Sequence, residues 1–388
     1  MNRRELLFGA APAFLQNRPQ RVIVFLIDGL GDDYIAASEM PVLKSWQRKG
    51  IAKTISGVMP SVTNANNSTL CCGCWPEQHG ITANFYLDEQ TGKELYMESA
   101  DLVLRPTLFE RAAKHGVTSA LLSSKKKTIG LLHRGARVVM SAEIPPAEWT
   151  QRLGAAPAIY SAGINHWLLK SAIWLAKNQR DLGVLYVHTT DYPMHMWPPG
   201  SAESKDHLAR LDALFGELAA AAPDAAILLA ADHGMNSKTR CWDLGLACAN
   251  RGLPLRAAIS AEQDKYLKHH RGFGGTAWVY LKSPQDADKA TRIMRGLAGV
   301  QEVLTRDEAA RRFHLMPSRI GQLVVLGDRE TVFGGLDTEQ EKMAPDYRSH
   351  GSLAEARVPL VVYNAPKAPA ASYFESTADA TRWLYAGV

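Results

Sequence analysis

The chain carries aspartate and histidine residues at places where α/β proteins often hold metal ions. Asp28 directly follows the apolar run at 22–27, and Asp232 and His233 directly follow a second apolar run at 226–231. Such runs are typical of buried parallel strands, and open α/β sheets bind their ligands at the carboxyl ends of these strands. A buried carboxylate without a partner is costly, so we expect a metal ion to be its partner.

Further candidate ligands are Asp191, His195 and His350. Asp191 and His195 are four residues apart, so on a helical turn they face the same way, and Pro193 fits the first turn of such a helix. Taken singly, an Asp-x-x-x-His spacing occurs by chance in most proteins, and a lone histidine is more often a surface residue than a ligand. Together, three aspartates and three histidines offer each of two ions at least three N/O donors. This set suits zinc, with manganese or iron as alternatives.

Thr63 is the candidate nucleophile, in a polar, asparagine-rich segment at 57–67. A bound metal lowers the pKa of a hydroxyl group, and two ions can stabilise both sides of an in-line displacement at phosphorus. In isolation, a loop threonine that makes a local turn hydrogen bond is the commoner explanation. The seven residues together predict a two-metal phosphoryl-transfer site.

Alternating strand and helix signals predict an α/β fold with a doubly wound, mostly parallel sheet flanked by helices. The predicted strands are at 21–27, 117–123, 182–188, 226–231 and 358–363, and the predicted helices are at 39–50, 107–115, 163–178 and 204–222. The segment at 57–67 is predicted to be a loop that runs into a helix at 68–74, whose N-terminal N–H groups would favour a phosphoryl group.

The pattern changes between residues 252 and 345, where we expect a smaller α+β cap insertion. Its predicted elements are strands at 276–281 and 323–326 and a helix at 286–297. The catalytic core would then comprise residues 20–251 and 346–388.

Composition limits the partners. The 388 residues carry a mild net charge of +5 and no block of lysine and arginine, so nucleic acid is not predicted. No apolar run reaches the roughly 18–20 residues that span a bilayer. A small anionic phosphonate or phosphate ester is the expected substrate, and a homodimer is a candidate assembly.

Residues 1–16 resemble a bacterial twin-arginine export signal. Arg3 and Arg4 precede a short apolar stretch that runs to Leu15. The prediction is a periplasmic protein with an export signal, and the sequence does not decide whether this leader is cleaved. The alternative is a cytoplasmic chain whose N-terminus happens to carry two arginines.

The five cysteines do not form a disulfide framework for a chain of this size. They are Cys71, Cys72, Cys74, Cys241 and Cys248. We expect the first three to pack on a helix under the sheet, with a thiolate metal site as the alternative. An oxidising compartment would permit one disulfide, but the sequence does not select a pair.

Taken jointly, these motifs resemble the alkaline phosphatase superfamily in its nucleotide pyrophosphatase/phosphodiesterase branch, and longer strings are similar to the phosphonoacetate hydrolase family. The likeness runs from about residue 20 to 365. The strings are Met59-Pro60-Ser61, Asn66-Asn67, Thr189-Thr190-Asp191-Tyr192, Ala231-Asp232-His233-Gly234-Met235-Asn236, His269-His270-Arg271-Gly272 and Arg348-Ser349-His350-Gly351. Two departures are Ala65, where the family pattern has proline, and the cysteine-rich stretch at 71–74.

The resemblance implies two zinc ions and a set of site residues. One ion would be held by Asp191, His195 and His350, and the other by Asp28, Asp232, His233 and Thr63. Asn84 would donate to a phosphoryl oxygen. Lys125 and Lys127 would bind the substrate carboxylate, provided that the segment is extended so that both point to one face. Without the resemblance, three consecutive lysines would be a solvated run.

The implied activity is cleavage of the C–P bond of phosphonoacetate to acetate and phosphate through a phosphothreonine intermediate. The alternative keeps the two metals and changes the substrate to a phosphodiester or phosphomonoester. A third hypothesis is a non-catalytic binding protein on the same fold.

Overall fold

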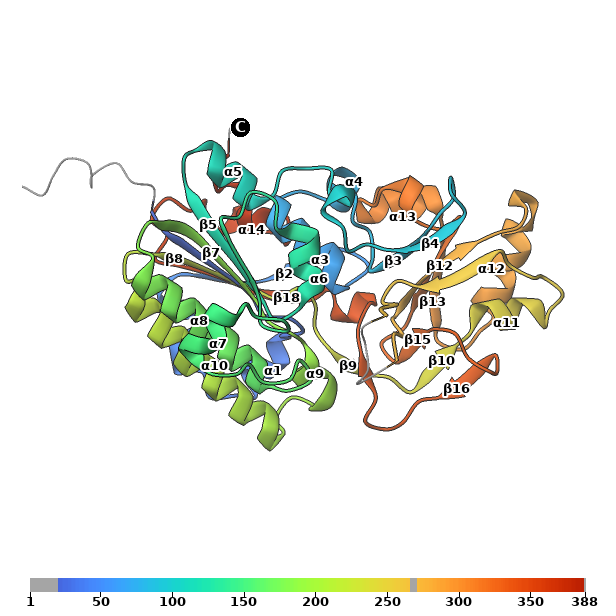
Figure 1. Ribbon diagram of the computed structural model, residues 1–388. Coiled ribbons are helices and arrows are strands. Elements are labelled where there is room, and N and C mark those ends of the chain that lie inside the picture. Colours follow the sequence, from blue (N-terminus) through green and yellow to red (C-terminus); the bar gives the residue numbers. More distant parts are fainter. Residues whose placement is uncertain (1–19, 266–270, 387–388) are drawn as a thin grey trace, which may run out of the picture.

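The computed structural model describes residues 20–265 and 271–386. The predicted export signal and His269-His270 lie outside the described residues. The described part has two halves: a sheet covered by helices on both faces, and a second group of strands and helices beside it (Figure 1).

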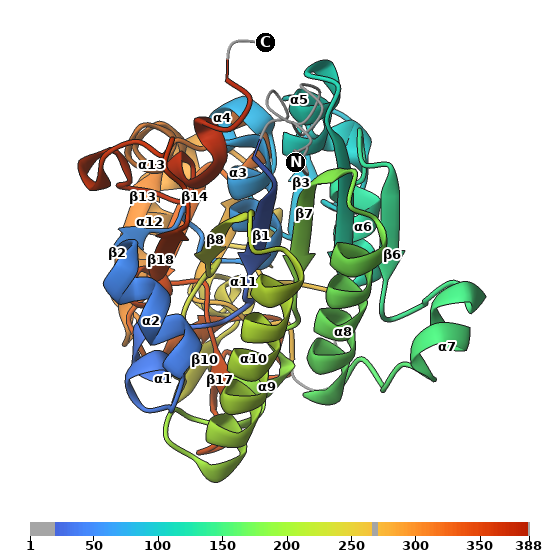
Figure 2. The ribbon, with the colours of Figure 1, turned by 90° about the vertical axis from the view of Figure 1, so that its left-hand side faces the viewer.

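The larger half is built on a seven-stranded sheet in the described residues, with the order β2-β18-β8-β1-β7-β5-β6 (Figure 2). Its strands are β1 (Val22–Leu26), β2 (Ile51–Ser56), β5 (Thr118–Ser123), β6 (Val138–Ser141), β7 (Leu182–His188), β8 (Ala226–Ala230) and β18 (Arg357–Tyr363). The central strands β1 and β8 are buried along their whole length, as their continuous apolar sequences predict. Within the described chain, β18 is the one strand of this sheet whose direction is opposite to that of the other six.

Helices cover both faces of this sheet (Figure 1). One face carries α2 (Pro41–Lys49), α8 (Gly163–Asn178) and α10 (Ala202–Ala221), and the other carries α3 (Thr63–Cys72), α5 (Leu108–Lys114), α6 (Lys126–Leu132) and α14 (Asp379–Arg382). Shorter helices are α1 (Asp32–Ala36), α4 (Pro76–His79), α7 (Ala147–Leu153) and α9 (Tyr192–Met196), and the 3-10 turns are η2 (Ala100–Leu102), η3 (Pro284–Asp286), η4 (Pro317–Arg319), η5 (Leu353–Glu355) and η6 (Ala371–Tyr373). The predicted α/β class with a mostly parallel, helix-flanked sheet is confirmed.

The second half contains an antiparallel sheet in the order β11-β12-β14-β13. Its strands are β11 (Ala257–Ser260), β12 (Thr276–Tyr280), β13 (Val300–Thr305) and β14 (Leu323–Gly327), with α12 (Ala287–Arg295) and α13 (Arg306–Phe313). A small sheet adds β10 (Arg240–Trp242), β15 (Thr331–Phe333) and β16 (Gln340–Lys342), next to α11 (Leu244–Ala249). β10 precedes residue 252, although it pairs with β15 and β16 of the second half. The predicted cap insertion at 252–345 therefore remains a proposal about domain organisation.

Two short antiparallel strand pairs lie where the halves meet. One is β3 (Phe85–Asp88) with β4 (Lys93–Tyr96), and the other is β9 (Asn236–Ser237) with β17 (Arg348–Ser349). Phe85 and Leu87 of β3 belong to the same apolar cluster as Trp278 and Tyr280 of β12. The first hairpin therefore ties the cap sheet to the core.

Two predictions about local structure are wrong. α3 begins at Thr63, not at residue 68, because its asparagine and threonine side chains are buried and hydrogen-bonded: Asn66 bonds to the backbone of Val58, and Thr69 to the carbonyl of Ala65. The lysine run is not extended either, because α6 begins at Lys126 and Lys125 is its N-cap.

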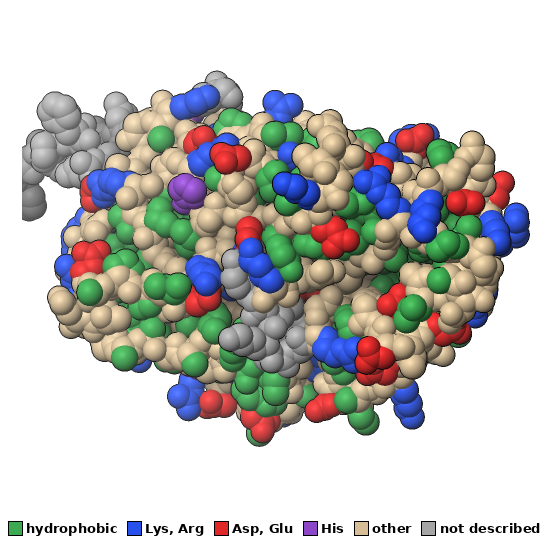
Figure 3. Space-filling view, turned by 45° about the vertical axis from the view of Figure 1, so that its right-hand side comes forward, with side chains coloured by type: hydrophobic (Ala, Val, Ile, Leu, Met, Phe, Trp, Pro, Cys, Tyr) green, Lys and Arg blue, Asp and Glu red, His purple; other side chains and the backbone are tan. Residues whose placement is uncertain are grey.

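No described helix is both long and apolar enough to cross a lipid bilayer. On the face drawn in Figure 3, acidic and basic side chains of the described residues are interspersed.

Candidate metal centre and active site

Strand register brings the candidate aspartates to one edge of the sheet. Leu26 of β1 pairs with Ala230 of β8, and Asp28 and Asp232 each follow two residues later, so they emerge side by side. Gly29, with a left-handed φ of 75°, turns the chain there, and its N–H donates to Asp232 Oδ1 at 3.1 Å. Both carboxylates are buried.

The antiparallel direction of β18 explains the position of His350. The amino end of an antiparallel strand lies at the carboxyl edge of its parallel neighbours, and His350 precedes β18. β2 is antiparallel to β18 and therefore ends at the same edge, where the chain continues to Thr63. Residues distant in sequence thus meet at one edge of the sheet.

Asp191, His195 and His350 form the first of two groups of potential metal ligands. Asp191 is the N-cap of α9, and its Oδ2 lies 3.0 Å from His195 Nε2. His195 Nδ1 contacts the carbonyl of Arg348 at 2.8 Å, and His350 Nδ1 contacts the carbonyl of Ser61 at 2.8 Å. A carbonyl oxygen accepts a hydrogen bond from Nδ1–H, so both rings present the Nε2 lone pair to the group, as metal-binding histidines do.

Asp28, Asp232 and His233 form the second group. His233 Nε2 lies 3.4 Å from Asp28 Oδ1 and 3.5 Å from Asp232 Oδ2. The two groups adjoin, because the rings of His233 and His350 stack with centroids 3.5 Å apart.

Both groups fit metal ions, because each contains buried polar atoms that lack a hydrogen-bond partner in the described residues. Asp28 Oδ1, Asp232 Oδ2 and His350 Nε2 are buried and make no hydrogen bond within the described residues. Burial, and next the Asp28 carboxylate, raise the pKa of Asp232 to about 8. Burial lowers the pKa of His233, but Asp232 and Asp28 outweigh it and raise this pKa to about 10. Besides burial, neighbouring negative charge raises both pKa values, and a bound cation would offset that charge.

Thr63 lies at the first turn of α3 and next to the second group. Its Oγ1 is 3.5 Å from His233 Nε2, and the residue is buried. The free N–H groups of a helix N-terminus favour an anion at this position. The arrangement suits attack by the hydroxyl on a phosphoryl group held over the two groups.

Asn84 faces the same space. Its Oδ1 accepts the N–H of Asn64 at 3.2 Å, which directs the amide nitrogen away from the α3 backbone. That nitrogen donates to the carboxylate of Glu262 at 3.0 Å. An amide donor therefore lies beside the candidate nucleophile.

The two candidate lysines point in different directions. Lys125 Nζ lies 2.6 Å from Asp28 Oδ2 and 2.8 Å from Asp191 Oδ1, so it bridges the two groups of ligands. Lys127, in the first turn of α6, pairs with Asp264 of the cap half. Burial has the largest effect on the pKa of Lys127 and lowers it, and nearby Lys125 lowers it further. Asp264, together with smaller contributions, outweighs both, so the pKa of Lys127 is raised overall.

Three polar residues at the site are not predicted from the sequence. His188 ends β7, and its Nε2 lies 3.4 Å from Asp28 Oδ2. It occupies the end of an apolar run, the same signal that identifies Asp28. Glu262 and Asp264 come from the cap half and have no comparable signal, because they do not follow a core strand.

The cysteines contribute no candidate ligand among the described residues. Cys71 and Cys72 of α3 are part of the buried core next to the sheet, and burial raises the pKa of Cys71 to about 12. All five thiols are free. The packing explanation of the cysteine-rich stretch therefore holds.

Comparison with known proteins adds independent information. The model of the type I phosphodiesterase / nucleotide pyrophosphatase family matches residues 22–353. An uncharacterized pyrophosphatase/phosphodiesterase of Schizosaccharomyces pombe is 26% identical over 207 residues, which are 51% of this chain and 40% of that relative. The chain thus matches less than half of that relative's length.

Solved structures of two proteins are similar over nearly the whole chain. Phosphonoacetate hydrolase from Sinorhizobium meliloti 1021, solved with phosphonoformate and with phosphonoacetate, is 29% identical with a TM-score of 0.83 over 93% of this chain and 94% of that one. Murine ectonucleotide pyrophosphatase/phosphodiesterase 5 shares the fold, at 16% identity and a TM-score of 0.68 over 93% of each chain.

Proposed function

The chain belongs to the type I phosphodiesterase/nucleotide pyrophosphatase family of the alkaline phosphatase superfamily, and from this premise we propose that it is a di-zinc hydrolase that cleaves the C–P bond of phosphonoacetate. Membership makes it a hydrolase of a metal-dependent superfamily. The observation that carries the finer proposal is the pair of lysines, Lys125 and Lys127, beside two adjoining groups of metal ligands. The 29% identical phosphonoacetate hydrolase supports the same substrate.

The two groups of ligands would each hold one zinc ion. Asp191, His195 and His350 supply one carboxylate and two imidazoles, and Asp28, Asp232 and His233 supply two carboxylates and one imidazole. Mixed N/O donors of this kind suit zinc, with manganese or iron as alternatives. When bound, the ions supply Lewis acidity toward the phosphoryl oxygens and lower the pKa of a hydroxyl group.

In the proposed reaction, Thr63 Oγ1 gives up its proton to solvent and attacks phosphorus while the C–P bond breaks. The electron pair of that bond moves to the methylene carbon and is delocalised into the carboxylate as an enolate, which takes a proton from solvent to give acetate. Water then hydrolyses the phosphothreonine, so phosphate leaves and Thr63 is regenerated. Asn84 donates to a phosphoryl oxygen.

The lysines stabilise the leaving group. Charge that develops on the enolate is balanced by Lys125 and Lys127, whose ammonium groups are largely buried and so interact strongly with a nearby anion. This role requires Lys127 to exchange Asp264 for the substrate carboxylate.

A phosphodiester or phosphomonoester is the second candidate substrate. Lys127 already has a carboxylate partner in Asp264, and a substrate without a carboxylate would leave that ion pair intact. The family name favours the same alternative.

The deciding experiment offers three substrates to the purified, zinc-loaded protein. Phosphate release from phosphonoacetate, with little from ethylphosphonate, supports C–P cleavage that depends on the substrate carboxylate. Release of phenol from an aryl phosphodiester, with phosphonoacetate inert, would assign the chain to the phosphodiesterases and reject the phosphonate proposal.

We also propose that residues 1–16 direct export to the periplasm through the twin-arginine route. Cell fractionation tests this directly: the protein should appear in the periplasm, and Arg3→Lys with Arg4→Lys should retain it in the cytoplasm. An unchanged distribution in the double variant would reject the export proposal.

A further inference from the structure

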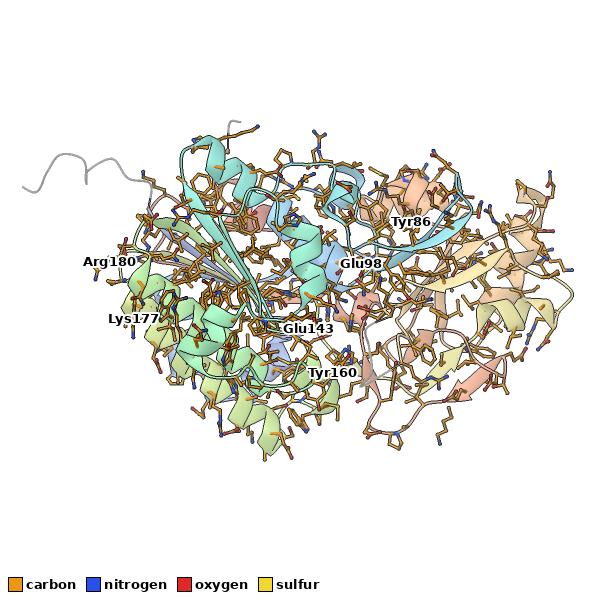
Figure 4. The ribbon with its side chains drawn as sticks, viewed as in Figure 1. Tyr86, Glu98, Glu143, Tyr160, Lys177 and Arg180 are labelled. Carbon is orange, nitrogen blue, oxygen red and sulfur yellow. The ribbon has the colours of Figure 1, made fainter. Side chains whose placement is uncertain are left out.

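A short segment of the cap half reaches the active site directly after β11. The carbonyl of Ala261 accepts the N–H of Asn84 at 3.0 Å, and Lys265 pairs with Glu98 of the core half. Glu98 lies between the two halves in Figure 4. The two acidic side chains of this segment, Glu262 and Asp264, are therefore held over the site from both ends.

Glu262 contacts the residues that surround the expected phosphoryl group. Its Oε2 accepts a hydrogen bond from Asn84 Nδ2 at 3.0 Å, and its backbone carbonyl lies 3.4 Å from the same nitrogen. Its Oε1 lies 3.4 Å from His350 Nε2, the atom that faces the first group of ligands. Glu262 is 3% exposed, so its carboxylate occupies an enclosed anion position.

Asp264 occupies the second anion position. Its carboxylate pairs with Lys127, and the side chains of Asp264 and Lys127 are only 4% and 9% exposed. Two residues apart in one segment, Glu262 and Asp264 thus cover two separate cationic or donor groups of the site. In the proposed function, Asn84 contacts the phosphoryl end of phosphonoacetate and Lys127 contacts its carboxylate end.

We propose that Glu262 and Asp264 are internal anions that compete with the substrate, Glu262 for Asn84 and Asp264 for Lys127, and so set which anions the site accepts. The assignment of the two ends rests on the proposed function. Because two anions held side by side in an enclosed site repel each other strongly, the substrate must displace each carboxylate before it makes the same contact. The competition weakens binding of the free ligand and leaves the chemical step unchanged, so it acts on Kd and KM.

The separate positions predict separate ligand classes. Orthophosphate has only a phosphoryl end and competes with Glu262 alone. Phosphonoacetate has both ends and competes with Glu262 and Asp264. An internal anion that acted only on the fold would not distinguish the two ligands.

The test measures binding of orthophosphate and of phosphonoacetate to the zinc-loaded protein by calorimetry. The variants are Glu262→Gln and Asp264→Asn, which keep the side-chain shape and remove the charge. Glu339→Gln is the matched control, because Glu339 forms an ion pair with Arg251 on the cap, away from the site. Zinc content and the thermal unfolding midpoint are measured for every variant.

We expect Glu262→Gln to tighten binding of both ligands by about three- to tenfold, the size expected for loss of one competing charged contact. Asp264→Asn should tighten phosphonoacetate by a similar factor and leave orthophosphate unchanged. Glu339→Gln should change neither affinity.

Three results would overturn the inference. Unchanged or weaker orthophosphate binding in Glu262→Gln would show that Glu262 does not compete. Loss of zinc from that variant would make Glu262 a metal ligand. Equal effects of Asp264→Asn on both ligands would make its role structural. Because orthophosphate binding does not depend on C–P cleavage, the Glu262 result stands even if phosphonoacetate is not turned over.

Discussion

Lys125 Nζ lies 2.6 Å from Asp28 Oδ2, and the same ammonium group lies 2.8 Å from Asp191 Oδ1. One aspartate belongs to each group of metal ligands, so Lys125 joins the two groups. Burial and Asp191 raise the pKa of Asp28, but Lys125, His188 and His233 outweigh them and hold it well below its ordinary value. Lys125 is therefore a counter-charge for the metal ligands as well as a candidate substrate contact.

Replacing Lys125 by alanine should destabilise the metal-free protein by about 3–5 kcal/mol, because removing one partner leaves buried carboxylates without a counter-charge. Zinc should restore much of this loss, since the ions provide the missing positive charge. Urea unfolding with and without zinc measures both values. Lys126→Ala is the control, because its 3.8 Å ion pair with Glu143 is partly exposed and contributes at most about 1 kcal/mol. An equal loss with and without zinc would contradict this account.

Replacing Lys127 by alanine should lower kcat/KM for phosphonoacetate by about 30- to 1000-fold, because a buried charged contact to the substrate carboxylate is lost. Turnover of an aryl phosphate ester should change by less than about threefold, since that substrate has no carboxylate for Lys127 to contact. Steady-state kinetics on both substrates provide the comparison. A similar loss on both would show that Lys127 supports the fold.

Replacing Thr63 by alanine should reduce turnover by at least about 10³-fold, because the attacking hydroxyl is removed. Both zinc ions should remain, since six other side chains hold them. Thr63→Ser keeps a hydroxyl and should retain measurable activity. Metal analysis and rapid-quench detection of the phosphorylated intermediate check both points. Full activity in the alanine variant would exclude Thr63 as the nucleophile.

Asp191→Asn should remove one zinc ion and keep the other, because Asp191 belongs to the first group of ligands. The second group consists of Asp28, Asp232 and His233. Zinc per chain should fall from about two to about one, since each group of ligands is proposed to hold one ion. His207→Gln is the control: His207 is buried between α8 and α10, next to His166 and apart from both groups. Loss of both ions would mean that the groups bind cooperatively, contrary to this prediction.

Glu355 gives a pH dependence of stability. Burial raises its pKa, but Lys238, at 2.8 Å, and then Asn236 and Ser352 outweigh burial and lower it. A carboxylate whose folded-state pKa is depressed stabilises the protein above the unfolded pKa of roughly 4.3, and this contribution is lost as pH falls through the folded value.

Glu355→Gln should therefore cost about 3–5 kcal/mol at pH 7, because it leaves the buried Lys238 ammonium without a counter-charge. The variant should also lose less stability than the parent protein as pH falls below about 4.5. Urea unfolding at several pH values measures both effects, with Glu339→Gln as an exposed control. Parallel pH profiles would show that Glu355 is not the group responsible.

Much of the fold follows from local patterns in the sequence. The strands β1, β7 and β8 are continuous apolar runs, and the predicted bounds lie within about a residue of the observed ones, because both faces of these strands are buried. The edge strands β2 and β6 are not predicted, because they are half-exposed or short and lack that signal. α3 begins earlier than predicted because tertiary hydrogen bonds to Asn66 override its low helix propensity.

The sequence alone identified the candidate metal ligands, because a residue such as Asp28 is marked by its own type and by the strand that precedes it. Tertiary structure decided what those ligands contact. Lys125 and Lys127 diverge because α6 begins between them, and a helix start sends successive side chains in different directions. Glu262 reaches Asn84 across 178 residues of sequence, a contact that only the packing of the cap against the core can make.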